Sequence, residues 1–141
     1  MTVQSVMTAN PACCTPTSSL HQVAMLMRDH DCGQIPVIDG LDSGRPVGVV
    51  TDRDIAIRVL AAGKNPLEGF AGDCMSTPCV TVRHDTSLAD CCALMESSKI
   101  RRVPVVDANG RVCGIVSLAD VARCADAATT IDVVKEVSAA A

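Results

Sequence analysis

Two short stretches of the chain carry a hydroxyl and a carboxylate at the same spacing. They are residues 48–54, with the sequence GVVTDRD, and residues 114–120, with the sequence GIVSLAD. Thr51 and Asp54 of the first stretch match Ser117 and Asp120 of the second. An aspartate carboxylate can accept hydrogen bonds from both hydroxyls of a ribose, and a hydroxyl beside the free N–H groups of a helix start can face a phosphate. The motif therefore carries groups that bind a nucleotide.

The same spacing is also a helix-capping pattern. Ser or Thr followed three residues later by a carboxylate satisfies free N–H groups at a helix start, which contributes about 1 kcal/mol without any ligand. For a single copy the cap is the simpler interpretation. The nucleotide interpretation gains weight because the pattern recurs at equivalent positions, each time after a glycine-led strand and an Ile/Val-Pro-Val run. Both interpretations stay open at this stage.

Nine cysteines and three histidines are the other reactive side chains. When the two halves of the chain are aligned, seven cysteines match apolar residues of the other half or lie near such a match, which favours a role in core packing. They are Cys13, Cys32, Cys74, Cys79, Cys91, Cys92 and Cys113. We expect the adjacent thiols of Cys13 and Cys14 to be more exposed. No Cys-x-x-Cys pair with zinc spacing occurs, and His21, His30 and His84 have no companion pattern for a nucleophile. We therefore predict no metal site, no catalytic residue and no enzymatic activity.

An internal duplication positions the two motifs. A shift of 66 to 68 residues superposes the halves, so that Met7 matches Met75 and Asp39 matches Asp107. The predicted organisation is a first repeat over residues 1–66, a second over 67–128 and a helical tail over 129–141. Within it, residues 64–74 are the expected linker, and the spacing of Ile131, Val134 and Val137 predicts the tail helix.

Each repeat has the pattern of a short extended segment, a helix, two strands and a second helix. Apolar residues recur at helical spacing in both first helices: Leu20, Val23, Ala24 and Met27, and Leu88, Cys91, Cys92 and Met95. β-Branched runs predict strands at 35–38, 47–51, 103–106 and 112–117, and the final helices start near Asp52 and Leu118, the first stopping at Gly63. The predicted fold class is α/β, of the α+β kind, built from tandem β-α-β-β-α units.

The composition narrows the classes of partner. The 141 residues are 48% hydrophobic, enough for a packed core, and the net charge of −4 gives no basic face for nucleic acid. No signal peptide or membrane span is evident, so we expect a cytoplasmic protein without a membrane partner. Phe70 is the single aromatic residue, so a planar ligand would have to be held by aliphatic side chains.

Over residues 5 to 125 the chain resembles the CBS domain family, whose paired units form nucleotide-sensing Bateman modules. Residues 99–107 (KIRRVPVVD) with 114–121 (GIVSLADV) are similar to the AMP-binding repeats of the AMP-activated kinase gamma subunit. Residues 51–55 (TDRDI) are similar to stand-alone bacterial two-CBS proteins of the hypoxic or stress-response type. The resemblance implies repeats packed with pseudo-twofold symmetry and a homodimer.

The resemblance also implies roles for particular residues. Asp54 and Asp120 would bind ribose, and Thr51 and Ser117 would lie on the phosphate side. The aliphatic walls of an adenine pocket, between the leading segments and the Pro-Val strands, would be Ile35, Pro36, Val103 and Pro104. The ligand would be AMP, ATP or a related adenine nucleotide such as ADP or NAD, with no covalent cofactor.

Arginines make the two predicted clefts unequal. Arg101 and Arg102 match family positions that reach the nucleotide phosphates, with surface exposure as the simpler alternative. The first repeat has Gln34 in place of Arg102, and Arg53 occurs only in that repeat. Arg53 would compensate there for the missing phosphate ligand, or pair with Asp52.

Two functional hypotheses follow. The first is a regulatory module in which an adenine nucleotide shifts the packing of the repeats or the geometry of a homodimer, and an unknown protein effector senses that shift. The second is a ligand-free dimeric adaptor, thiol-responsive through its cysteines, in which both Ser/Thr-x-x-Asp motifs are only helix caps.

Overall fold

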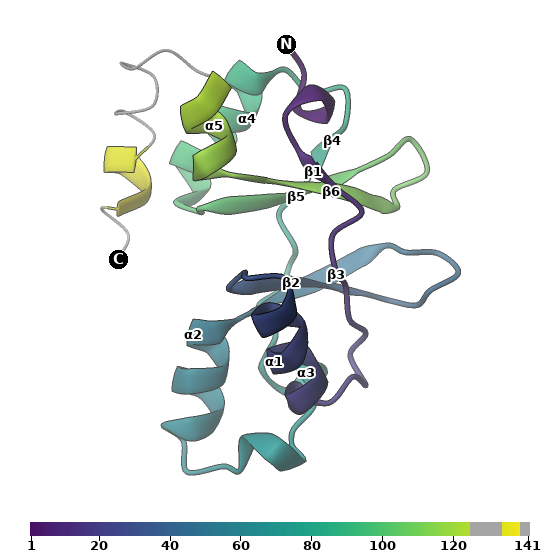
Figure 1. Ribbon diagram of the computed structural model, residues 1–141, viewed down its shortest axis with the longest axis vertical. Coiled ribbons are helices and arrows are strands. Elements are labelled where there is room, and N and C mark those ends of the chain that lie inside the picture. Colours follow the sequence, from purple (N-terminus) through teal and green to yellow (C-terminus); the bar gives the residue numbers. More distant parts are fainter. Residues whose placement is uncertain (125–133, 139–141) are drawn as a thin grey trace. The chain divides into compact units, whose positions relative to one another are not determined.

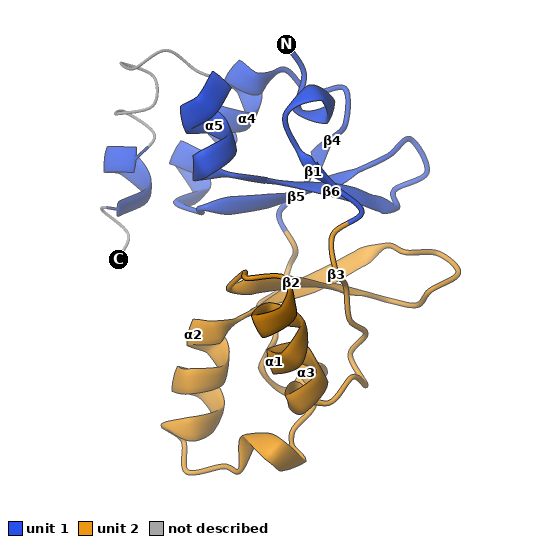
Figure 2. Ribbon diagram, in the orientation of Figure 1, with its two compact units in different colours: residues 1–10, 80–141 blue, residues 11–79 orange. Residues whose placement is uncertain are grey.

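The computed structural model describes residues 1–124 and 134–138, which fall into two compact units. Unit 1 contains residues 1–10 and 80–141, and unit 2 contains residues 11–79 (Figure 2). Each unit combines helices with paired strands, so the predicted mixed α/β class is confirmed.

Unit 2 is a two-stranded antiparallel hairpin with helices on one of its faces (Figure 1). Its elements are α1 (Leu20–Asp29), β2 (Gln34–Ile38), β3 (Pro46–Thr51), α2 (Asp52–Asp54), the π-helical η2 (Ile55–Leu60), the 3-10 helix η3 (Pro66–Glu68) and α3 (Ala71–Cys74). α1 begins at Ser19, whose side chain forms a capping box with Gln22. α2 runs directly into η2, and Gly63 follows in the left-handed conformation with φ +79°. This is the stop expected from the sequence.

Unit 1 is built around a four-stranded sheet with the order β1-β6-β5-β4. Its elements are the 3-10 helix η1 (Val3–Ser5), β1 (Thr8–Ala9), β4 (Val82–Arg83), α4 (Leu88–Ser98), β5 (Arg102–Val106), β6 (Val112–Ser117) and α5 (Leu118–Cys124). The β5–β6 hairpin is antiparallel, and β4 runs parallel to β5. The predicted strands are therefore confirmed in both repeats, with one residue added at the start of some of them.

Matching aspartates close the two hairpin turns. The N–H of Asp39 donates to the carbonyl of Arg45 over 2.9 Å, and the N–H of Arg45 donates back to Asp39 Oδ1 over 3.1 Å. Asp107 and Arg111 form the same two bonds, over 2.9 and 3.0 Å. The duplication is thus reproduced at the level of single hydrogen bonds.

The leading segment of each repeat packs in the unit that holds the body of the other repeat. Thr8 pairs with Ile115 of β6, although it belongs to the first repeat. Ser76 exchanges backbone hydrogen bonds of 2.8 and 3.1 Å with Val49 of β3, although it belongs to the second. The repeat bounds 1–66 and 67–128 thus describe the duplication in the sequence and do not coincide with the compact units.

Residues 64–74, expected to be a linker, are folded against the helix of the first repeat. They contain η3 and α3. The carbonyl of Gly69 accepts from Leu20 N–H over 2.9 Å, and Ala71 N–H donates to the carbonyl of Ser18 over 2.8 Å. The expected linker is therefore folded, which the sequence did not show because turn-forming residues do not reveal which distant backbone groups they contact.

Each unit has its own hydrophobic core. In unit 1, all four apolar residues predicted for the helical stripe of α4 are buried: Leu88, Cys91, Cys92 and Met95. In unit 2, Leu20, Val23 and Met27 of α1 are buried, but Ala24 is exposed, which corrects the predicted stripe. Its match in α4, Cys92, lies in the core, so helical spacing alone does not decide how wide a buried stripe is.

The described part of the tail adds to the core of unit 1. Residues 134–138 are helical, and Val137 is 2% exposed within the unit 1 core. Val134 is exposed, and Ile131 lies outside the described residues. The rest of the expected tail helix, 129–133 and 139–141, lies outside the described residues. Among the described residues, no helix is long and apolar enough to cross a membrane.

The cysteines largely follow the core interpretation. Cys14, Cys74, Cys91 and Cys92 are buried, and Cys124 is exposed. The expectation of an exposed Cys14 was wrong, because its backbone bonds to β2, the Cys14 N–H donating to the carbonyl of Pro36 over 3.0 Å. Burial, together with the neighbouring thiols Cys13 and Cys74, raises the pKa of Cys14 to about 12.

Two glycines allow the leading segments to approach the strands. A Cβ on Gly48 would lie 2.8 Å from the backbone oxygen of Ser76 and 3.1 Å from the sulfur of Met75. A Cβ on Gly114 would overlap the side chain of Met7 and would meet no backbone atom among its nearest contacts. Gly48 is therefore required by packing against backbone, independently of any ligand, whereas a larger residue at Gly114 would require the Met7 side chain to move.

We expect Gly48→Ala to lower the free energy of unfolding by about 1–3 kcal/mol, because the added methyl overlaps backbone that cannot yield easily. The measurement is thermal unfolding followed by circular dichroism. Gly40→Ala is the matched control, since a Cβ at Gly40 meets nothing within 4 Å. Equal melting temperatures for the two variants would show that the leading segment does not pack as described.

We expect iodoacetamide to alkylate Cys124 well before Cys14 or Cys91 in the folded protein. Burial raises the pKa of Cys14 to about 12 and that of Cys91 to about 11, and the reactive species is the thiolate. Peptide mass mapping over time measures the order, and labelling in guanidinium chloride is the control in which the difference disappears. Early modification of Cys14 would contradict its burial.

Candidate functional site

In both units the motif carboxylate lies where a strand passes into a helix. Thr51 ends β3 and is the N-cap of α2. Ser117 ends β6 immediately before α5. The strand positions the hydroxyl, and the first helical turn brings the aspartate back toward it. This local geometry follows from the sequence spacing alone.

Asp54 is buried, with 9% exposure, and its two oxygens have different partners. Oδ2 accepts from the backbone N–H of Thr51 over 3.0 Å, while Asp54 N–H donates to Thr51 Oγ1 over 3.0 Å. Oδ1 lies 3.6 Å from Arg58 Nε. The hydroxyl of Ser76, from the leading segment of the second repeat, donates to the carboxylate over 3.2 and 3.3 Å.

Asp120 is 3% exposed and repeats this division. Its Oδ2 accepts from Ser117 N–H over 2.8 Å and from the Ser117 hydroxyl over 3.1 Å. Its Oδ1 forms an ion pair with Arg123. In both units, therefore, one carboxylate oxygen closes the cap and the other faces an arginine of the following turn.

The capping alternative is thus present in the structure, because both motifs satisfy their own polar groups without a ligand. A ribose hydroxyl would have to share or displace the arginine at Oδ1. The sequence did not predict Ser76, Arg58 and Arg123 as partners of these carboxylates. The two arginines do not stand at equivalent repeat positions, and Ser76 comes from the other repeat, so duplication gave no signal for any of them.

The residue beside each hydroxyl differs between the units. Gln34 pairs with Thr51 across β2 and β3, and Arg102 pairs with Ser117 across β5 and β6. Directly paired residues of antiparallel strands place their side chains on the same face. Among the buried side-chain nitrogen and oxygen atoms of the described residues, Gln34 Oε1 is the one without a hydrogen-bond partner. A buried acceptor that is left without a hydrogen-bond donor typically lowers the stability of a folded protein by about 1–3 kcal/mol.

The three arginines predicted for the phosphate side differ in solvent exposure. Arg101 and Arg53 are exposed, and Arg102 is half-buried. The carboxylate of Asp52 accepts from the backbone N–H of Arg53 over 2.8 Å, and no ion pair between these two side chains occurs in the described structure. The phosphate roles stay predictions.

The four residues predicted to form the adenine walls separate into two groups. Ile35 and Val103 belong to the cores of their own units. Alternation along a strand places Pro36 and Pro104 on the other face, which they share with Thr51 and Ser117. Pro36 and Pro104 are therefore the two predicted wall residues that share a face with the motif hydroxyls.

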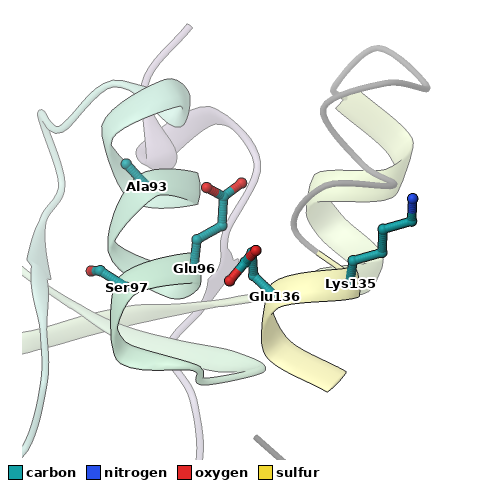
Figure 3. A pocket seen from close by; sticks show the side chains of 5 residues that line it. All are labelled: Ala93, Glu96, Ser97, Lys135 and Glu136. Atoms are coloured by element: carbon teal, nitrogen blue, oxygen red, sulfur yellow. The ribbon is translucent and has the colours of Figure 1, made fainter. Parts of the chain in front are cut away.

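Two cavities of the described chain contain none of the motif residues in their lining, although the second is bordered by Arg58, the partner of Asp54. One of about 440 Å³ lies between α4 and the 134–138 helix and is lined by Ala93, Glu96, Ser97, Lys135 and Glu136 (Figure 3). The other, of about 410 Å³, borders Arg58 and the 64–73 segment. Within the described ranges, no group of three or more His, Cys, Asp or Glu is arranged to hold a metal ion.

Comparison with known proteins gives relatives of similar and of greater length. An uncharacterized protein of Methanopyrus kandleri, MK0525, is 39% identical over 107 residues, which are 76% of this chain and 54% of that protein. The chain thus spans about half of that relative. Hypoxic response protein 1 of Mycobacterium tuberculosis is 37% identical over 122 residues, 86% of this chain and 83% of that protein.

Solved structures of similar proteins include ligand complexes. Hypoxic response protein I, with two coordinated zinc ions, superposes with a TM-score of 0.79 at 36% identity, covering 89% of this chain and all of that one. CBSX2 in complex with AMP gives 0.73 at 32% identity, covering 88% and 95%. The CBS pair of MJ0100, with 5′-methylthioadenosine and S-adenosylmethionine, gives 0.76 at 28% identity, covering 87% and 94%.

The CBS domain family matches residues 3–61 and 71–126, one match for each repeat. The two matches together take in the Gly-x-x-Thr/Ser-x-x-Asp motifs, both hairpins and both leading segments. Since they cover well over half of the 141 residues, the chain belongs to the CBS domain family.

Proposed function

We propose that this protein is a regulatory module that binds an adenine nucleotide. The observation that carries the proposal is the recurrence, in both units, of a buried aspartate held beside a strand-end hydroxyl. Similar CBS proteins have been solved with AMP and with adenosine thioethers or sulfonium compounds, which share adenine and ribose. The ligands expected here are AMP, ATP or a related adenine nucleotide.

The binding groups follow from the two strand ends. Asp54 and Asp120 would bind ribose through the oxygens that now face Arg58 and Arg123. Thr51, Ser117, Arg101, Arg102 and Arg53 are the proposed phosphate-side groups. The proposed adenine walls are Ile35, Pro36, Val103 and Pro104, and of these the two prolines have the better placed side chains.

Regulation is proposed to occur through packing. A ligand changes a conformational equilibrium only when it binds one state more tightly than another. We propose a cytoplasmic homodimer whose geometry responds to the nucleotide and is sensed by a protein effector, with no catalytic step in this chain.

A ligand-free adaptor is the second candidate, favoured by one observation. Both motif carboxylates already have hydrogen-bond donors from the cap and an arginine, so the helix starts are complete without a nucleotide. The adaptor predicts that mutation of the aspartates affects stability alone.

We expect isothermal titration calorimetry to detect binding of AMP, ADP, ATP or NAD to the full chain. Because the protein has no Trp or Tyr, co-purified adenine would dominate its ultraviolet absorbance, which gives an independent check. Absence of binding to all four compounds would reject the nucleotide proposal and leave the adaptor.

We expect Asp120→Ala to lower nucleotide affinity at the unit 1 site about tenfold or more, since it removes a buried charged acceptor. The same change removes a cap and lowers stability by about 0.5–2 kcal/mol. Calorimetry measures the first effect and denaturant unfolding the second. Ser87→Ala is the matched control, because Ser87 caps α4 without belonging to the motif. A stability loss without an affinity loss would support the adaptor.

A further inference from the structure

Three positions near the motif hydroxyl have the same backbone contacts in both units. They are residues 33, 34 and 52 in unit 2 and residues 101, 102 and 118 in unit 1. The carbonyl of Gly33 accepts from Asp52 N–H over 3.0 Å, and the carbonyl of Arg101 accepts from Leu118 N–H over 3.0 Å. The next residue of each strand, Gln34 or Arg102, pairs with the motif hydroxyl residue. The chemistry of these three positions can therefore be compared directly between the units.

The comparison shows opposite charge. Unit 1 has Arg101, Arg102 and Leu118, two positive charges and an apolar side chain. Unit 2 has Gly33, Gln34 and Asp52, a single negative charge. The Asp52 carboxylate lies close to this strand start, since a Cβ on Gly33 would be 2.9 Å from its Oδ2. An anionic group is therefore attracted at this position in unit 1 and repelled in unit 2.

The buried oxygen of Gln34 adds an independent constraint. Oε1 has no donor among the described residues, and it lies on the face that carries Thr51. A ligand that satisfies it must bring an N–H or O–H group, as the adenine amino group and the ribose hydroxyls do. The oxygens of an ionised phosphate only accept hydrogen bonds, so they could bind Gln34 only through its neutral Nε2 amide, a weaker donor to an anion than the Arg102 guanidinium of unit 1.

The arginines of unit 2 do not restore the missing charge at this position. Arg58 lies against Asp54 and donates to the carbonyls of Cys74 and Met75 over 3.5 and 3.3 Å. Arg53 is exposed, directly after Asp52. Arg53 is nevertheless the remaining cation of unit 2 that could contact a phosphate, and the Arg53→Gln variant tests this role separately.

We propose that the two sites select different ligands: unit 1 a phosphate-bearing adenine nucleotide, and unit 2 an adenosine derivative whose 5′ substituent is uncharged or cationic. Residues 33, 34 and 52 determine the selectivity of unit 2, and residues 101, 102 and 118 that of unit 1. This inference rests on the proposed function, because it divides one adenine-binding activity between two sites.

The test is a reciprocal exchange in the full chain, followed by calorimetry with AMP and with 5′-methylthioadenosine. In the wild type we expect one AMP site per chain. Arg101→Gly with Arg102→Gln should weaken AMP binding at least about tenfold more than 5′-methylthioadenosine binding. Gln34→Arg with Asp52→Leu should create a second AMP site. A gain of binding cannot arise from misfolding, and thermal melting verifies the fold of the first variant.

Each alternative result has a distinct meaning. Two equal AMP sites in the wild type would overturn the inference while the proposed function stands. Unchanged AMP stoichiometry after Gln34→Arg with Asp52→Leu would also overturn it. A wild-type AMP site in unit 2 that disappears in Arg53→Gln would assign that charge to Arg53 and reject the selectivity proposed here. Binding of neither compound to the wild type would reject the proposed function itself.

Discussion

The hydrogen bonds between the strand-end hydroxyl and the buried aspartate set the geometry on which the rest of each unit depends. They turn the chain from a strand into a helix, over Thr51 and Asp54 in unit 2 and over Ser117 and Asp120 in unit 1. The helix that follows then packs on the hairpin. A buried carboxylate is stable only with such partners. An arginine faces the second oxygen in both units, so a polar ligand at that oxygen would have to share or displace the arginine.

A second constraint acts on the strand before this turn. Gly48 and Gly114 leave room for the leading segment of the other repeat, which lies across them through Met75 and Met7. In unit 2 this segment also supplies Ser76 to the Asp54 carboxylate. Neither unit is thus complete from one repeat alone. Each unit combines segments of both repeats, and residues 64–74 between the repeats are folded against the start of α1 within unit 2.

Equivalence of backbone does not imply equivalence of chemistry. The two units share caps, hairpin turns and strand registers, yet the side chains next to the motif differ in charge and in hydrogen-bond capacity. Gln34 in place of Arg102 leaves a buried acceptor where the other unit has a cation. Duplicated folds retain positions that packing requires, while ligand-facing positions are free to change. These charge differences between otherwise matching positions are the basis of the separate ligand selectivities that we propose for the two units.

The sequence by itself determined the strands, the buried face of α4 and both Ser/Thr-x-x-Asp caps, because these depend on spacing within a few residues. It also determined the repeat, because the two halves match residue by residue. It also indicated the core role of most cysteines through the apolar residues that match them in the other repeat. Only the tertiary structure decided that Cys14 is buried and Ala24 exposed, that Ile35 and Val103 face the cores, and that Ser76 and Arg58 reach Asp54. Such contacts join distant parts of the chain or depend on which face a neighbouring element covers, and spacing along one strand or helix carries no information about either.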